Sequence, residues 1–379
     1  MKVVHLTSVH SPFDVRIFHK ECRSLARSGY DVVLVAPHTH DETVDGVRIK
    51  AVAKGSHRLS RMTRIVSAIY HKAVMEHADI YHFHDPELIG AGLMLAARGK
   101  KVIYDIHEDC PADILDKHYL PTKVRRPLSW LAKHVEDFSA PRFSALITAT
   151  NAIARRFVRF KNTVIIHNYP LSEEIYAKSD FQSYERCSSV AYVGGITPYR
   201  GIREAIQAMQ TLAPDLNAAL ELAGPYSPQS FRAQLIQLPG WTHVREWGIL
   251  TRAEVRSLLG RVTLGLLLYH GVANNITAEP NKLFEYMAAG IPVIASNFPV
   301  WRQLIREVDC GVLVDPSDVD AIADALNFFL THSNEARAMG ERGRRAVLQR
   351  FNWETERCKL TQLYSALLGS TNIEAAVRT

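Results

Sequence analysis

The sequence has few of the features that mark secreted, membrane-spanning or repeat proteins. No apolar run approaches the roughly 18 residues that a transmembrane helix needs. The N-terminus carries a single Lys and no long apolar region with a small-residue cleavage site, so we expect no signal peptide. Low-complexity segments and fixed-period repeats are absent from the sequence. The 5 cysteines show no C-x-x-C or paired spacing, which favours a reducing, cytoplasmic compartment and argues against structural zinc: Cys22, Cys110, Cys187, Cys310 and Cys358.

Length and charge limit the classes of protein that remain. The chain has 379 residues, too many for one ordinary core, and we expect two domains of roughly 170–190 residues. With 47% hydrophobic and 22% charged residues, the composition is that of a globular protein. The formal net charge of +6 is compatible with nucleic acid, an anionic membrane surface or a polyphosphate substrate as partner. No zinc finger or RNP aromatic pair is visible in the sequence, so we expect no nucleic-acid partner.

Strand-length apolar segments alternate with helix-length amphipathic segments, which indicates doubly wound parallel sheets. In the first half we expect strands at 2–7, 31–36, 80–84, 101–106, 145–149 and 163–167, and helices at 18–28, 87–98 and 153–160. A polar linker follows, and the pattern restarts with strands at 190–193, 218–223, 262–268 and 312–314, and helices at 201–212, 230–236, 252–259 and 319–330. The last expected helix is 353–368, with an apolar face formed by Leu360, Tyr364, Ala366 and Leu367.

The most informative stretch is PNKLFEYMAAGIPVIAS, from Pro280 to Ser296. It predicts a helix that ends at Gly290 and a buried strand at 291–295, with core positions at Leu283, Phe284 and Met287. The N-terminus of such a helix, with Asn281 and Lys282, suits a phosphate group. Glu285, one turn in, could hold sugar hydroxyls; the alternative is an ordinary surface Glu on an amphipathic helix.

This stretch resembles the donor-site signature of glycosyltransferase family 4, the retaining sugar transferases of the GT-B fold. The segments 10–38, 81–92 and 102–109 resemble other parts of the same family, in the expected order, and the resemblance runs from Lys2 to about Trp353. It implies an α/β fold of two Rossmann-like doubly wound domains facing across a cleft. The implied organisation is an acceptor-side domain at 1–168, a linker at 169–188, a nucleotide-sugar domain at 189–350, and a helix at 351–379 that crosses back to the first domain.

The implied reaction moves a hexose-type sugar from a UDP- or GDP-sugar to an acceptor hydroxyl. Relatives need neither a metal nor another cofactor, so we expect none. The leaving phosphate itself could take the acceptor proton, which dispenses with a dedicated base. A GT-B epimerase or phosphorylase is disfavoured because no lysine–pyridoxal signature is visible. A sugar-binding protein without transfer activity is the alternative outside the enzymes.

In the second domain, the resemblance assigns residues to the donor. The loop 194–201 follows a predicted strand, its glycines permit close backbone approach to an anion, and Arg200 is a forked phosphate donor. Where the family has an Arg after the first glycine, this chain has Gly195, and we expect Lys282 to replace that cation. The family's first signature Glu is Thr277 here, so only the second, Glu285, is carried over, and Thr277 or Asn275 could take part of the missing role. The expected donor-binding set is Gly194, Gly195, Gly224, Gly248, Thr277, Pro280 and Asn281, with Gly248 near the base.

In the first domain, the expected site residues follow strands. His107 follows the strand 101–106, and in the family this His touches the transferred sugar; the alternative is a His that caps a strand end. His82-Phe83-His84-Asp85 offers at most half a zinc site, so we expect no metal and place His84 and Asp85 along the cleft. In the loop 8–17, where relatives have a glycine pair, Asp14 and Arg16 either recognise the acceptor or anchor the loop by a salt bridge. Together with His107, the catalytic candidates are Arg200, Lys282 and Glu285.

The segment 120–143 concentrates positive charge beside apolar residues. It predicts either a basic amphipathic helix on an anionic membrane surface or a solvated helix with Trp130 in the core. On the first interpretation the protein is peripheral at the inner face of the membrane, and the acceptor is a lipid-linked or growing glycan. On the second, a soluble small-molecule acceptor is as good a candidate. The residues concerned are Lys123, Arg125, Arg126, Lys133 and Arg142, with Leu128, Trp130 and Leu131.

Overall fold

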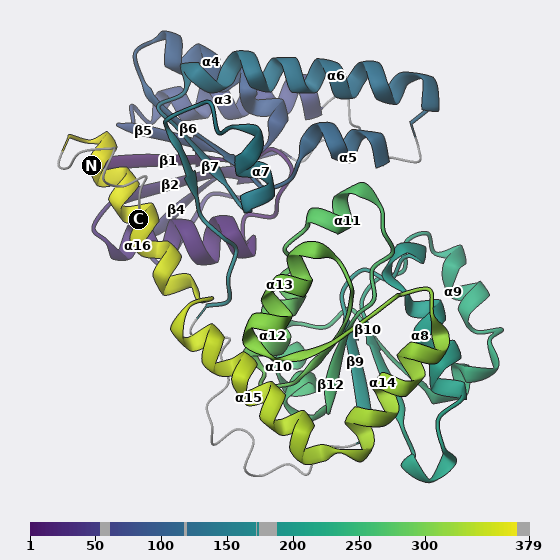
Figure 1. Cartoon of the computed structure of the whole chain (residues 1–379). Coiled ribbons are helices and arrows are strands. Elements are labelled where there is room, and N and C mark those ends of the chain that lie inside the picture. The colour runs from purple at the N-terminus through teal and green to yellow at the C-terminus, as the bar shows by residue number, and fades with distance from the viewer. Residues whose placement is uncertain (54–60, 117–119, 172, 174–187, 370–379) are drawn as a thin grey trace. The chain divides into compact units, whose positions relative to one another are not determined.

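The computed structural model describes residues 1–53, 61–116, 120–171, 173 and 188–369 (Figure 1). The chain divides into two compact units, Met1–Asn168 with Trp353–Thr379 (unit 1) and Tyr169–Asn352 (unit 2). Most of the expected linker at 169–188 lies outside the described residues. Among the described helices, none has the length and apolar character needed to cross a bilayer.

Unit 1 is built on an eight-stranded sheet with the order β3-β4-β2-β1-β5-β6-β7-β8. All neighbours are parallel except β3 and β4, which form an antiparallel pair. The strands are β1 (Lys2–Leu6), β2 (Asp31–Pro37), β3 (Glu42–Val44), β4 (Val47–Val52), β5 (Ile80–Phe83), β6 (Lys101–Ile106), β7 (Ala145–Thr148) and β8 (Thr163–Ile165).

Helical segments connect these strands, and their starts follow from local capping. The Asp14 side chain accepts from the N–H groups of Arg16 and Ile17 at the start of η1, and Thr150 caps α7 in the same manner. The segments are η1 (Val15–Cys22), α1 (Arg23–Arg27), η2 (Arg61–Ile65), α3 (Val66–Met75), η3 (Pro86–Leu88), α4 (Ile89–Ala97), α5 (Cys110–Asp116), α6 (Thr122–Ser139), η4 (Ala140–Arg142), α7 (Asn151–Arg156) and α16 (Trp353–Leu367).

The C-terminal helix α16 belongs to unit 1. Trp353 donates its indole N–H to Ser24 Oγ at 2.9 Å, and the expected apolar face of α16 is buried. On the sheet, side chains alternate between two faces, and Val4, Val33 and Tyr81 pack with α3 and α4 in one core. His5 and His82, direct partners in neighbouring strands, have the opposite parity. Polar side chains therefore lie on the second face of this sheet.

Unit 2 is an all-parallel six-stranded sheet with the order β11-β10-β9-β12-β13-β14. Its strands are β9 (Ser189–Val193), β10 (Ala219–Ala223), β11 (Val244–Gly248), β12 (Leu264–Leu267), β13 (Val293–Ser296) and β14 (Gly311–Val314). The helices are η7 (Pro198–Arg200), α8 (Ile202–Gln210), η8 (Pro214–Leu216), α9 (Ser230–Leu235), η9 (Pro239–His243), α10 (Arg252–Arg261), α11 (Ala273–Thr277), α12 (Asn281–Ala288), α13 (Pro299–Val308), α14 (Val319–Thr331) and α15 (Ser333–Gln349).

The predicted fold class, α/β with doubly wound sheets, is confirmed in both units. The expected strands agree with the observed ones to within about two residues at each end. The helix expected at 153–160 begins and ends earlier, as Asn151–Arg156. The pair β3–β4, the edge strand β11, and the helices α3, α13 and α15 were not predicted.

The strand order locates the places where ligands bind. In an open parallel sheet, the crevice lies beyond the carboxyl ends of the two strands from which the connections diverge. These strands are β1 and β5 in unit 1, and β9 and β12 in unit 2. The loops that follow them carry most of the predicted site residues.

Candidate functional site

In unit 2, Lys282 lies across the glycine loop that follows β9. Gly194 has φ 132°, in the region that favours glycine, and a Cβ there would overlap Cε of the Lys282 side chain. The Gly194 N–H donates to the Ala223 carbonyl at 2.7 Å, which ties this loop to the end of β10. The Lys282 ammonium is 5.9 Å from the centre of the Tyr192 ring. A lysine from α12 and the backbone after β9 thus meet, and the idea that Lys282 replaces the cation missing at Gly195 stays a prediction.

Arg200 is held at the same switch point by an aromatic ring. Its guanidinium carbon is 3.7 Å from the centre of the Tyr269 ring, just beyond β12. The next residue, Gly201, has φ 65°, and a Cβ there would overlap the Leu268 carbonyl oxygen. Burial raises the pKa of Tyr192, while the charge of Arg200 acts in the opposite direction. Arg200 and Lys282 are both half-buried, so each charge is held in place and still reaches solvent.

Two helices begin at this crevice without a side-chain cap. Neither α8, which follows Gly201, nor α12, which follows Pro280, has a capping hydrogen bond from its N-cap residue. Their first N–H groups are therefore available to an anion. Two helix N-termini and two cations at one sheet edge are suited to a diphosphate.

Glu285 lies one turn into α12, on the side away from the core. Its neighbours Leu283, Phe284, Tyr286 and Met287 are buried, whereas Glu285 is half-buried. Within the described residues its carboxylate makes no hydrogen bond or ion pair, so it is available to a ligand. The structure therefore places Glu285 and Lys282 on the same short helix, as predicted.

The residues that could take the role of the family's missing first Glu differ in their surroundings. Thr277, at the end of α11, is exposed, and Asn281 is exposed at the start of α12. The Asn275 side chain is buried and donates to the His270 carbonyl at 2.9 Å. Asn275 thus holds the loop together, and a part for it in the role of the missing Glu stays a prediction. Thr277 stays a prediction.

A pocket of about 410 Å³ opens beside the ends of β10 and β11. Two glycines expected to bind the donor, Gly224 and Gly248, line it, and both have positive φ. The sequence analysis missed an ionic pair in its wall, in which Arg232 binds Glu246 at 2.7 Å. The other lining residues are Leu222, Pro225, Tyr226, Gln229 and Ile249.

In unit 1, Asp85 organises the loop that follows β1. It accepts hydrogen bonds from Thr7 Oγ1 at 2.8 Å and from the Ser8 N–H at 2.6 Å. His84 and Asp85 are each only 3% exposed. The expectation that these two side chains line the cleft is therefore wrong: Asp85 shapes the loop, and His84 makes buried contacts with His5 and Asp105.

His10, which the sequence analysis did not single out, lies in this loop between two carboxylates. Its Nδ1 is 3.5 Å from Asp14 Oδ2 and its Nε2 is 3.4 Å from Asp85 Oδ1. The bond to Asp14 is the main cause of a raised pKa of His10. Burial alone would raise the pKa of Asp14, but the bonds from His10 and the Ile17 N–H outweigh it and lower that pKa. Asp14 therefore caps η1 and pairs with His10.

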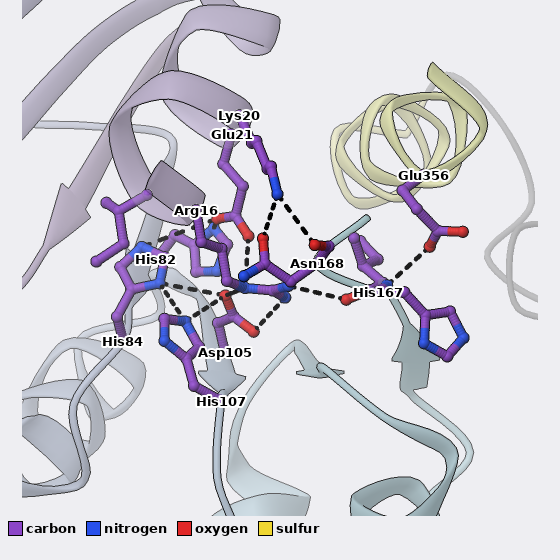
Figure 2. Close-up of polar contacts among 12 residues, drawn as sticks. Arg16, Lys20, Glu21, His82, His84, Asp105, His107, His167, Asn168 and Glu356 are labelled. Carbon is purple, nitrogen blue, oxygen red and sulfur yellow. Dashed lines mark hydrogen bonds and ion pairs between the residues drawn. The ribbon is translucent and has the colours of Figure 1, made fainter. Parts of the chain in front are cut away.

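Arg16 is buried, and this corrects its expected role at the acceptor (Figure 2). Its Nε and Nη2 donate to the two oxygens of Asp105, each at 2.9 Å, and its Nη1 donates to the Ile166 carbonyl at 3.0 Å. Burial disfavours the charge on Asp105, yet the guanidinium outweighs this and holds the pKa of Asp105 well below its usual range. The alternative, an anchoring salt bridge, is what the structure contains, with Asp105 as the partner.

His107 contacts the same carboxylate from the other side. Its Nε2 is 2.8 Å from Asp105 Oδ2, and His84 Nδ1 is 3.2 Å from that oxygen. The His107 side chain is 18% exposed, whereas those of Asp105 and His84 are fully buried. Figure 2 shows the group, with His107 at its margin. His107 is therefore the member of this group that can reach a ligand.

Behind His107 lies a buried polar cluster of His5, Glu21, His82, His84 and Tyr364, most of it unforeseen. Burial lowers the pKa of His5 and of His82 well below the usual range, and that of His84 to about 4. Burial also raises the pKa of Glu21. The signal that could have revealed the cluster is polar residues at alternate positions of strands that are otherwise apolar.

Within the described residues, three groups of side chains offer ligand atoms within 4.8 Å of one another: His5, Glu21, His82 and His84; His38, His40 and Glu42; and His84, Asp105 and His107. In the first group the ring nitrogens that face one another are already hydrogen-bonded. His5 Nδ1 is 3.0 Å from His84 Nε2, and His82 Nδ1 is 2.7 Å from the Tyr364 hydroxyl. The second group is partly exposed, and His38 in it follows β2, the neighbour of β1. The expectation that no metal takes part stays a prediction.

Comparison with known proteins gives two family models that together cover most of the chain. Residues 15–168 match a glycosyl transferase 4-like domain, and residues 177–346 match glycosyl transferases group 1. A curated relative, the MMP alpha-(1->4)-mannosyltransferase of Mycolicibacterium hassiacum, is 22% identical over 291 residues, 74% of this chain and 69% of the relative.

Solved structures match over nearly the whole chain. Sucrose-phosphate synthase from Thermosynechococcus elongatus superimposes with a TM-score of 0.78 at 16% identity, covering 98% of this chain and 100% of that one. Anabaena HepE in complex with UDP-glucose gives a TM-score of 0.73 at 15% identity, covering 97% and 100%. At these identities the likeness concerns the fold.

Proposed function

The chain belongs to glycosyltransferase family 4, the retaining, nucleotide-sugar-dependent transferases of the GT-B fold, and on this premise we propose that it moves a hexose from a UDP- or GDP-sugar to a hydroxyl of a lipid-linked or growing glycan. The observation that carries the donor half is the meeting of Lys282 with the Gly194 loop, beside Arg200 and two uncapped helix N-termini. A departing nucleoside diphosphate gains negative charge as the sugar bond breaks. Fixed positive groups at this place stabilise that charge without reorganisation.

Each remaining candidate then has a task in the same reaction. The Glu285 carboxylate binds the ribose hydroxyls, for which it is free within the described residues. Gly224 and Gly248 leave room for the base in the pocket that they line. His107 contacts the transferred sugar. The leaving phosphate takes the acceptor proton, so the reaction needs no separate base.

The acceptor half of the proposal rests on α6. Val124, Trp130, Leu131, Val135 and Phe138 are exposed by 40–62% of their surface, and all except Trp130 recur at helical spacing along one stripe. The alternative in which Trp130 lies in the core is wrong, since it is 62% exposed. Exposed basic side chains, Lys123, Arg126, Lys133 and Arg142, accompany the stripe.

This arrangement fits an anionic membrane surface. Apolar side chains on a helix enter the boundary between headgroups and acyl chains, and each nearby Lys or Arg contributes about 1 kcal/mol of attraction. The Arg142 guanidinium is 3.6 Å from the centre of the Phe138 ring, so charge and apolar surface occur together. An enzyme held at such a surface meets acceptors that carry a lipid.

Purified full-length protein, incubated with a panel of UDP- and GDP-hexoses, tests the donor half. We expect slow hydrolysis of one donor, measured as nucleotide release, and faster release when a membrane glycolipid extract is added. Binding of a donor without any release under either condition would instead favour a sugar-binding protein. Acceleration by soluble sugars but not by the extract would favour a soluble acceptor.

A further inference from the structure

The hydrogen positions around His107 follow from one ionised carboxylate. Asp105 is paired with Arg16 through both of its oxygens and is therefore an acceptor only. Its Oδ2 lies 2.8 Å from His107 Nε2 and 3.2 Å from His84 Nδ1. Both of these ring nitrogens must carry a hydrogen in order to bond to it.

The assignment continues through the cluster without a free choice. With hydrogen on Nδ1, neutral His84 has a lone pair on Nε2, which accepts from His5 Nδ1 at 3.0 Å. His5 Nε2 then accepts from the Tyr364 hydroxyl at 3.2 Å, and the Tyr364 oxygen accepts from His82 Nδ1 at 2.7 Å. The chain ends at His82 Nε2, which has no hydrogen-bond partner among the described residues.

Along this path from Asp105 to His82, each N–H or O–H hydrogen that faces a neighbour is used in a hydrogen bond. The three buried histidines are neutral, with hydrogen on Nδ1, which agrees with their lowered pKa values. These hydrogen bonds extend from Asp105 to helix α16, and they hold the side chains rigidly because His84, His5 and Tyr364 each both donate and accept. They fix Asp105 from one side while Arg16 fixes it from another.

We propose that Asp105 is a positioning residue of the transfer reaction, which keeps the hydrogen of His107 on Nε2 and so presents the Nδ1 lone pair as a hydrogen-bond acceptor for a hydroxyl of the bound sugar. This rests on the proposed function and deepens it, since it assigns His107 the acceptor role in that bond. The His107 Nδ1 makes no hydrogen bond within the described part of the chain, and the side chain is partly exposed. A sugar hydroxyl that donates to Nδ1 is thereby oriented before the bond to the diphosphate breaks.

The first test locates the hydrogen on the His107 ring directly and does not depend on transferase activity. In full-length protein with 15N-labelled histidine, long-range 15N–1H spectra show which ring nitrogen carries hydrogen, and the His107→Gln variant identifies the His107 signals. We expect hydrogen on Nε2 of His107 in the wild-type protein. Hydrogen on Nδ1, or an exchange average between the two, overturns the proposal.

The second test separates positioning from structure through a double-mutant cycle. Asp105→Asn is expected to lose the fixed hydrogen position of His107 and to lower kcat about 10- to 100-fold, as loss of a group that orients a catalytic His does. In the His107→Gln background the same substitution is expected to cost nothing further. Additive losses in the two backgrounds overturn the proposal.

Asp105→Asn removes one of the two carboxylates that pair with the buried Arg16, leaving Glu21 at 3.2 Å, and could prevent folding. The companion variant Asp105→Asn with Arg16→Met removes both charges and is read in the same cycle. A wild-type protein that transfers from no donor overturns the proposed function together with this role. A wrong hydrogen position in an active protein overturns the role of Asp105 alone.

Discussion

Lys282 and Arg200 place positive charge at the switch point of unit 2. We expect Lys282→Gln and Arg200→Gln each to lower kcat by about two to three orders of magnitude, because each removes stabilisation of the leaving diphosphate. Steady-state kinetics with the best donor measures this effect. The matched control is Arg337→Gln, an exposed arginine on α15, which should keep the wild-type rate. Full rate in both test variants would place the diphosphate elsewhere.

Glu285 offers a test of donor binding that leaves folding intact. Its carboxylate is half-buried and unbonded within the described residues, so Glu285→Ala should keep the melting temperature. A hydrogen bond to a charged group contributes about 1.5–3 kcal/mol, which corresponds to about 10- to 100-fold weaker donor binding. Titration calorimetry with the donor measures this loss. An unchanged dissociation constant would show that Glu285 is only a surface residue.

Single residues were predictable where their chemistry is local. Gly194, Gly201 and Arg200 could be placed in a loop, and Lys282 at a helix N-terminus, because each of these elements is local in sequence; that they bind the donor stays a prediction. Arg16 could not be placed in this way, because its partner Asp105 is 89 positions away along the chain. The same is true of His5 and Tyr364, whose contact depends on how α16 packs on unit 1.

At the scale of elements, apolar patterning succeeded where elements bury large side chains. The buried strands β1, β2, β6 and β13 were all expected, since each is mostly apolar, although β1 contains His5 and β6 contains Asp105. Edge strand β11 is mostly exposed and has no such run. The helix α15 buries chiefly small residues, and at Gly340 a Cβ would overlap the Gly290 carbonyl. Close backbone packing of this kind leaves no hydrophobic period to detect.

The next prediction is that helix α6 binds the protein to anionic membranes. Trp130→Ser with Phe138→Ser should reduce co-sedimentation with vesicles of phosphatidylglycerol and phosphatidylcholine at all salt concentrations, because it removes the apolar contact. Lys123→Ser with Arg126→Ser should reduce it mainly at low salt, since each cation contributes about 1 kcal/mol that salt screens. Arg125 is left in place because it bonds to the Leu120 carbonyl.

The control for this experiment is Met75→Ser, which removes an exposed apolar side chain on α3. It should bind vesicles like the wild-type protein. Loss of binding in the control, or no binding of the wild-type protein at low salt, would contradict the membrane surface. A concentration-dependent dimer that the Trp130 and Phe138 substitutions abolish would instead identify a second copy of the chain as the partner.

At the scale of the whole molecule, the two units divide the predicted chemistry. Unit 2 holds the cations, the helix N-termini and the pocket that we propose bind the nucleotide sugar. Unit 1 holds His107 and a buried polar cluster that costs stability unless every group is bonded. Family membership and the fold of both units followed from the sequence. The buried cluster did not, although it determines how unit 1 responds to pH.

The last prediction concerns that response. In the folded chain, the pKa values of His5, His82 and His84 are below the ordinary 6.5. Below pH 6.5 these histidines are therefore protonated in the unfolded chain but stay neutral in the folded chain. Their contribution to stability is lost as pH falls from about 6.5 toward 4. Glu21 acts in the opposite direction, since its folded pKa is raised and the folded chain keeps a proton that the unfolded chain releases.

Urea unfolding followed by circular dichroism should therefore show the free energy of unfolding falling by about 3 kcal/mol for each pH unit of acidification, which corresponds to a net uptake of about two protons on unfolding. His10 has a raised pKa, so it changes the pH dependence of the free energy of unfolding only above pH 6.5 and does not affect the range between pH 6.5 and 4. The variant His82→Gln should reduce the slope of the free energy of unfolding against pH by the equivalent of about one proton. A free energy of unfolding that is constant or rises as pH falls would show that the histidines are not held neutral in the folded chain.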